Sequence, residues 1–121
     1  MKEYPVTIDN RNFVIQVGQN AKENWQLIDE ADEFDLWFHL DDKPSGHVII
    51  KEILNAKNKF DIKNDFFGYP YKLVVMGSEH CKSQSKHKTS KVTVVYTTIG
   101  NVKKGKDVGS VIIKNSKRII L

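Results

Sequence analysis

The sequence of 121 residues is 40% hydrophobic and 28% charged, a composition that excludes disorder along the whole chain and fits one domain spanning residues 1–121. No apolar run approaches the roughly 18 to 20 residues that cross a bilayer, and none follows the first residues, so we expect no membrane span and no secretory signal. The net charge of +4 is uneven, because residues 1–60 hold 7 Lys/Arg and 11 Asp/Glu (−4), whereas residues 61–121 hold 12 and 4 (+8).

Strand periodicity near the N-terminus predicts a hairpin. Apolar and polar residues alternate around residues 6–8 and 13–17, and the residues between them, Asp9–Asn12, have turn chemistry. A helix should follow over residues 20–30, and its first turn carries a capping box formed by Asn20 and Glu23. Its apolar face consists of Ala21, Trp25 and Ile28, which favours core packing over base stacking for Trp25.

Two further strands are predicted on either side of a polar turn. Residues 36–40 and 47–50 are apolar, and residues 41–46 read Asp-Asp-Lys-Pro-Ser-Gly. His39 and His47 flank this turn, so both rings could face one cleft. We therefore expect the two histidines to shape a binding surface.

Three kinds of chemistry are open for this cleft. Trp37 either stacks on bases or packs inside the sheet, and the pattern favours neither. A zinc site would need more ligands, drawn from Asp41, Asp42, His80 and Cys81, but their spacing is not that of a metal site, so we expect no metal and no cofactor. The two adjacent carboxylates of the turn are more typical of a solvated turn than of acid–base catalysis.

A second helix is predicted over residues 70–84, because Pro70 suits a first turn and apolar residues recur at helical spacing. The residues that share one face are Tyr71, Val74, Val75, Ser78 and Cys81. Cys81 is the single cysteine, and its neighbour His80 points elsewhere on a helix, so we expect a packed, unreactive thiol. A single cysteine also favours a reducing, cytoplasmic location.

Lysines and hydroxyl groups are concentrated in two later segments. Residues 82–91 contain no apolar side chain, and their candidate phosphate contacts are Lys82, Ser85, Lys86, Lys88 and Lys91. The second cluster consists of Lys103, Lys104 and Lys106, in a predicted loop over residues 99–108. If the sheet brings both segments together, they form one basic face for a polyanion. A solvated, lysine-rich face that only keeps the protein soluble would have the same composition.

The C-terminal third predicts strands over residues 92–96, 111–113 and 118–121, of which the last two should form a closing hairpin around Asn115 and Ser116. Strands and two main helices without a regular strand–helix alternation are typical of an α+β fold. We therefore expect a mixed or antiparallel sheet in a single domain.

Several blocks of the sequence resemble the NFACT-R domain, the RNA-binding module of the NFACT proteins of ribosome quality control. They comprise residues 17–24, 35–39, 44–51, 81–86, 94–97 and 102–106. In the family the turn usually reads Pro-Gly-Ser-His, whereas Ser45 and Gly46 stand in the opposite order here. The resemblance implies an α+β domain that binds tRNA or ribosomal RNA, and it brings no catalytic residue.

These observations lead to an expected RNA-binding protein without covalent chemistry of its own. Its interface would combine the lysine-rich face with a cleft of Trp37, His39 and His47. Two alternatives stay open: an RNA-processing enzyme that uses His39 and His47 as acid and base, and an adaptor that binds protein on the ribosome.

Overall fold

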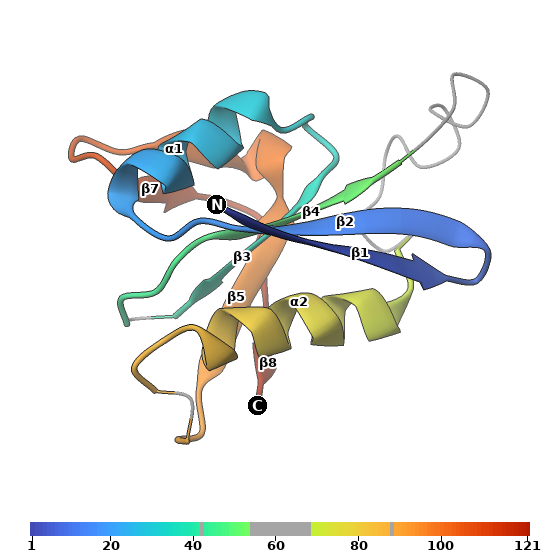
Figure 1. Cartoon of the computed structure of the whole chain (residues 1–121). Helices are drawn as coiled ribbons and strands as arrows, with labels where there is room; N and C mark the ends of the chain where they lie inside the picture. Colours follow the sequence, from blue (N-terminus) through green and yellow to red (C-terminus); the bar gives the residue numbers. More distant parts are fainter. Residues whose placement is uncertain (42, 54–68, 88) are drawn as a thin grey trace.

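The computed structural model describes residues 1–41, 43–53, 69–87 and 89–121 (Figure 1). Within these residues, six strands form an antiparallel sheet in the order β1-β2-β4-β3-β5-β8, and β6 pairs with β7 in a separate ribbon. The elements are β1 (Lys2–Ile8), β2 (Arg11–Val17), α1 (Ala21–Glu30), β3 (Leu36–Leu40), β4 (Val48–Glu52), α2 (Tyr71–Ser83), β5 (Thr93–Thr98), the 3₁₀-helix η2 (Ile99–Asn101), β6 (Val102–Lys104), β7 (Val111–Ile113) and β8 (Lys117–Ile120). The predicted α+β class with two main helices is confirmed.

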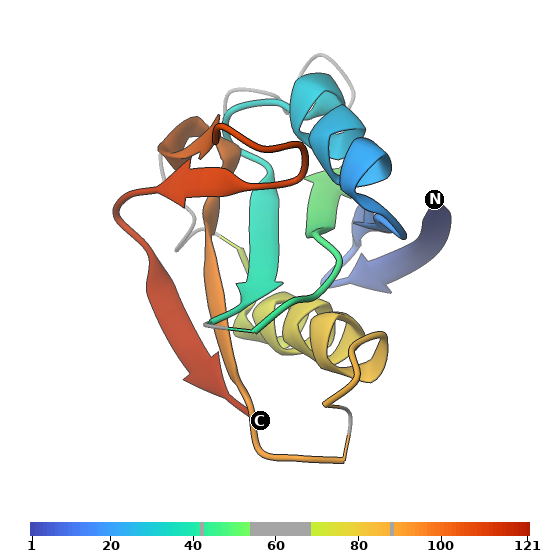
Figure 2. The ribbon, with the colours of Figure 1, turned by 90° about the vertical axis from the view of Figure 1, so that its left-hand side faces the viewer.

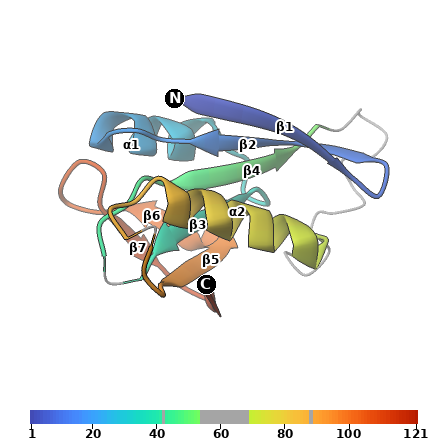
Figure 3. The same ribbon diagram turned by 60° about the horizontal axis from the view of Figure 1, so that its bottom comes forward.

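Both faces of the central strands are covered, which positions every side chain of the predicted cleft. Helix α2 packs on one face, and α1 lies with the β6–β7 ribbon on the other (Figures 1 and 3). Successive residues of a strand point to opposite faces, so Phe38 joins the α2 side and Trp37 the α1 side. This arrangement explains why β3 is apolar without alternation.

The N-terminal hairpin is confirmed, and its turn is tighter than predicted. Residues Asp9 and Asn10 both have positive φ, 52° and 61°, as a two-residue turn of type I′ requires. Asn and Asp tolerate this conformation better than other side chains. The turn sets the register that pairs Ile8 with Arg11.

Helix α1 begins as predicted but buries a different face. The Asn20 side chain accepts a hydrogen bond from the Glu23 N–H at 2.9 Å, and Asn24 and Leu27 are the buried residues. Trp25 is only half-buried, because it faces the β6–β7 ribbon and not the sheet. Its indole N–H donates to the Ser110 carbonyl at 3.0 Å. The prediction of core packing for Trp25 is therefore wrong.

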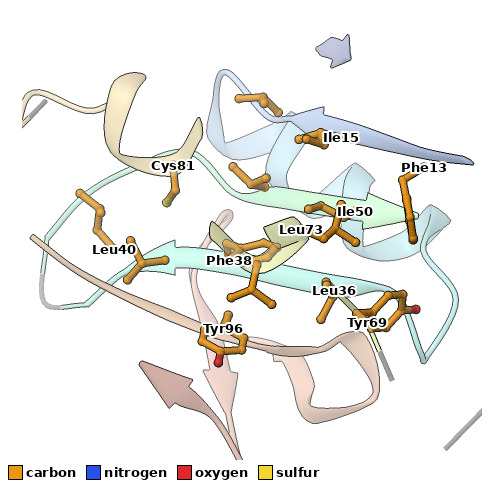
Figure 4. Close-up of a cluster of buried hydrophobic side chains, with 14 of the residues drawn as sticks. Phe13, Ile15, Leu36, Phe38, Leu40, Ile50, Tyr69, Leu73, Cys81 and Tyr96 are labelled. Carbon is orange, nitrogen blue, oxygen red and sulfur yellow. The ribbon is translucent and has the colours of Figure 1, made fainter. Parts of the chain in front are cut away.

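Helix α2 forms within the predicted range and covers the larger core, but its buried face is rotated from the predicted one. Figure 4 shows Phe38, Leu73 and Cys81 within this core, and Cys81 is fully buried. Tyr71 was assigned to the apolar face but is 65% exposed, since Leu73 and Gly77 face the sheet instead. No helix among the described residues is both long enough and apolar enough to cross a membrane.

The predicted C-terminal hairpin is wrong. Strand β7 pairs with β6, while β8 pairs with β5 at the edge of the sheet. Val111 and Ile113 pack on the α1 side of the sheet, and burying them there outweighs local pairing with β8. Lys103 and Lys104 consequently lie in a strand and not in the predicted loop.

Candidate nucleic-acid interface

Trp37 and His47 are buried, so the predicted open cleft does not offer their rings to a ligand. Each is 1% exposed, and the Trp37 indole N–H donates to His47 Nδ1 at 3.2 Å. The β6–β7 ribbon covers this face of β3, and Val111 and Ile113 pack against the cluster that contains Trp37. This degree of burial argues against the predicted contacts of Trp37 and His47 with bases.

His39 is half-buried and stands between this buried pair and the surface. Its ring stacks on Trp37 with centroids 5.9 Å apart, and Nδ1 lies 2.6 Å from the Leu40 carbonyl oxygen, as expected for a donated hydrogen bond. His39 also borders two surface pockets, and Trp37 and His47 line the second of them with it. Of the three residues predicted for the cleft, His39 is the most exposed.

Burial keeps both histidines neutral near pH 7. It lowers the pKa of His47 to about 3, with a smaller effect from His39 in the same direction, and the Gly109 backbone opposes the shift. Burial likewise lowers the pKa of His39, and hydrogen bonds to the Leu40 and Ser45 backbone oppose this shift. An imidazole whose nitrogen already accepts from Trp37 is poorly suited to take up a substrate proton, so this geometry does not favour the acid–base pair of the enzyme alternative.

The other chemically reactive groups have structural partners. Among the described residues no group of three His, Cys, Asp or Glu side chains is placed to hold a metal. Burial raises the pKa of the Cys81 thiol to about 11, consistent with the expected packed thiol. Asp41 accepts a hydrogen bond from Arg118 Nε at 2.8 Å, and Asp42 lies outside the described residues.

A groove of about 530 Å³ opens at one end of the sheet, where four chain segments meet. They are the β2–α1 junction, the β3–β4 turn, the loop after α2 and the β6–β7 loop, all on the side that Figure 2 turns toward the viewer. Its lining includes Gln19, Asn20, Ser45, Gln84, Lys86 and His87, and none of the described residues that line it is acidic. A negatively charged ligand therefore meets no carboxylate among the described lining residues.

The first basic segment borders this groove. Lys86 lines it, Lys91 is exposed further along the loop, and Lys82 is half-buried on the last turn of α2. Ser85 is buried: its hydroxyl donates to the Lys82 carbonyl at 2.7 Å and accepts from the His87 N–H at 3.0 Å. Ser85 therefore closes the end of the helix, and although it lines the groove, these bonds argue against its predicted phosphate contact. Lys88 lies outside the described residues.

The three lysines of the second basic segment differ in their contacts. Lys104 Nζ lies 2.5 Å from Asp29 Oδ1 and 5.2 Å from the Trp25 ring centroid, so its charge is directed at α1. Lys103 and Lys106 are exposed. The loop that contains Lys106 continues to Val108 and Gly109, which line the groove. The fold thus brings loops of both basic segments to one groove.

Three polar residues of the groove had no role of their own in the sequence prediction. Gln19, Gln84 and His87 form no charge run and no ligand spacing, so composition alone does not single them out. Gln19 and Gln84 do fall within the blocks that resemble the NFACT-R domain. That resemblance was the available signal.

Comparisons with known proteins agree with this architecture. Residues 3–115 match the family model described as the NFACT protein RNA binding domain. Among the solved structures, the C-terminal part of the fibronectin/fibrinogen-binding protein from Streptococcus suis superposes with a TM-score of 0.75 over 98% of this chain, at 24% identity, which shows a shared fold. The chain spans 44% of the length of that solved chain. No curated protein matches it.

Proposed function

The chain belongs to the NFACT RNA-binding domain family, and we propose that it binds RNA through its basic end. The basic end is defined here as the groove together with Lys82, Lys86, Lys91, Lys103 and Lys106. The observation that carries the proposal is the groove at which loops of both basic segments meet, with no acidic side chain among its described lining residues. A sugar–phosphate backbone laid across it replaces mobile counterions with fixed lysines.

Burial separates the residues that contact the RNA from those that support the surface. Exposed lysines such as Lys86 and Lys106 contact phosphates, and these contacts position the RNA without reading its sequence. Trp37 and His47 act behind the surface. His47 lies against the Gly109 backbone in the β6–β7 loop, and its own N–H donates to Asn24 Oδ1 at 3.0 Å. These contacts tie the β6–β7 loop to α1.

We further propose that the RNA is tRNA or ribosomal RNA and that the protein works in the cytoplasm, in translation or ribosome quality control. Family membership and the blocks of resemblance in the sequence support this assignment. The buried free thiol of Cys81 is compatible with a reducing compartment. The adaptor alternative differs in its physical signature, because protein contacts made away from the basic end would depend weakly on salt.

Crosslinking in cells tests the RNA class. The chain is crosslinked by ultraviolet light, purified under denaturing conditions, and the attached RNA is sequenced. Enrichment of tRNA or ribosomal RNA over a charge-matched control protein is the expected result. Recovery of RNA dominated by messenger RNA would contradict the assigned class, and recovery at the level of the control would contradict RNA binding itself.

A further inference from the structure

The side-chain amide of Gln84 is available to bind a ligand in the groove. Gln84 follows the last turn of α2, and its backbone N–H is bonded to the His80 carbonyl at 3.3 Å. Among the described residues, its side-chain amide has no hydrogen-bond partner, although it lines the groove. An amide offers a donor and an acceptor side by side, the pattern that also occurs along the edge of a nucleobase.

The Gln84 amide lies against Gly46. A Cβ at Gly46 would lie 2.6 Å from Gln84 Oε1 and 2.8 Å from Nε2, so the glycine leaves room for the amide beside its backbone. The same Cβ would lie 2.3 Å from the Gly18 carbonyl oxygen. The absence of a side chain at Gly46 therefore lets three segments meet and leaves the exposed Gln84 amide space at the groove.

Buried hydrogen bonds support this floor from below. The Gly18 N–H donates to the His47 carbonyl at 2.9 Å, and the His47 N–H donates to Asn24 Oδ1 at 3.0 Å. Asn24 and His47 are 7% and 1% exposed. A polar surface whose supports are buried and bonded is pre-organised, so little ordering is needed when a ligand binds.

Other parts of the groove lining suit a phosphate. Lys86 lies at the groove, and the first turn of α1 borders it with Asn20 and Ala21. Asn20 caps the Glu23 N–H, which leaves the N–H groups of Ala21 and Lys22 without a partner inside the helix. These backbone N–H groups favour a negatively charged ligand, whereas the neutral Gln84 amide has no such preference.

We propose that the groove holds one unpaired nucleotide of the RNA, with its base edge on the Gln84 amide and its phosphate toward Lys86 and the first turn of α1. The volume of about 530 Å³ lies within the range of roughly 300–1,000 Å³ found for small-ligand sites. A base inside a duplex keeps its pairing edge in the stack, so only an unstacked base can reach the amide. This inference rests on the proposed RNA binding and adds a base-reading position to it.

Substitution of Gln84 by Met tests the base contact while keeping a side chain of similar length. The matched control is Gln26→Met, an exposed glutamine on α1 outside the groove lining. Binding is measured for heptamers of adenylate, cytidylate or uridylate across a salt series. The wild-type chain should rank the three by about tenfold between best and worst, near the low end of what a bidentate amide–base pair contributes. Gln84→Met should bind them within about twofold of one another at an unchanged salt slope, and Gln26→Met should keep the wild-type ranking.

A second measurement does not depend on the variant. In the wild-type chain, the side-chain amide resonance of Gln84 should shift on addition of the preferred heptamer, and that of Gln26 should stay in place. Equal binding of the three heptamers, an unchanged ranking in Gln84→Met or an unmoved Gln84 resonance would overturn the nucleotide site. If equal binding keeps its steep salt dependence, RNA binding itself stands, whereas failure of the wild-type chain to bind any RNA would overturn the proposed function as well.

Discussion

Replacing Lys86 and Lys106 together with alanine should weaken binding to single-stranded RNA about 25-fold near 0.1 M salt. Each phosphate contact contributes about 0.7 to the slope of log affinity against log salt, so two contacts contribute about 1.4. Because 0.1 M salt is one decade below 1 M, these two contacts contribute about 1.4 decades of affinity over that range, or about 25-fold. Both side chains are exposed, and removing them should leave the fold intact.

The matched control is the double variant of Lys72 and Lys114, which are also exposed and do not line the groove. It lowers the net charge by the same amount, so a general effect of charge would appear equally in both variants. Fluorescence anisotropy over a salt series gives affinity and slope together. Equal losses in the two double variants would contradict a localised basic end and favour the solvated-lysine interpretation of the charge.

Substitution of His47 by Gln should remove a pH dependence of about 2 kcal/mol from the free energy of unfolding. In the folded chain the pKa of His47 falls to about 3 from its ordinary value of 6.5, because the ring is buried. Between these two pH values, the unfolded chain therefore binds a proton that the folded chain excludes. The stability that the neutral His47 ring contributes to the folded chain is fully present above pH 6.5 and is lost as the pH falls toward 3. Between pH 6.5 and pH 5, a span of 1.5 pH units at about 1.36 kcal/mol each, the free energy of unfolding therefore falls by about 2 kcal/mol.

Urea unfolding of both proteins at pH 7 and pH 5 measures the difference. Asp35 has the opposite effect, since burial raises its pKa to about 6 and its ionisation opposes folding as the pH rises; it is present in both proteins and cancels in the comparison. The wild-type chain should lose about 2 kcal/mol more than His47→Gln on acidification. Equal losses would mean that His47 is accessible to water and not sealed under the β6–β7 ribbon.

Local patterns were sufficient to predict the elements whose partners are near in sequence. The Asp9–Asn10 turn, the Asn20 cap and the Pro70 start of α2 each depend on a few adjacent residues. Strand β3 was equally clear because four of its five residues are apolar. What these signals do not contain is the choice of partner among strands that are far apart in the chain.

One wrong pairing explains most errors at the candidate site. A strand over residues 111–113 has the same apolar pattern whether it pairs with β8 or with β6, and the sequence prediction chose β8. Pairing with β6 places a ribbon over Trp37 and His47 and closes the cleft that the prediction left open. Burial of these two rings is thus a consequence of long-range topology and not of their local sequence.

The basic residues were predictable as a class but not individually. Charge asymmetry located the correct half of the chain, and Lys86, Lys103 and Lys106 are exposed as expected. Lys104 and Ser85 are engaged by partners, which composition and local pattern do not indicate. The position of the Gln84 amide against Gly46 likewise depends on the tertiary structure.

The most direct test of the basic end is a chemical-shift map of the isotope-labelled chain titrated with single-stranded RNA. Binding at the basic end should shift backbone resonances of residues 18–21, 44–46, 84–87 and 103–110, and those of β1 and of the first turn of α2 should stay nearly unchanged. Shifts concentrated on β1, β8 or the exposed face of α2, with the groove residues unmoved, would contradict RNA binding at this end of the molecule.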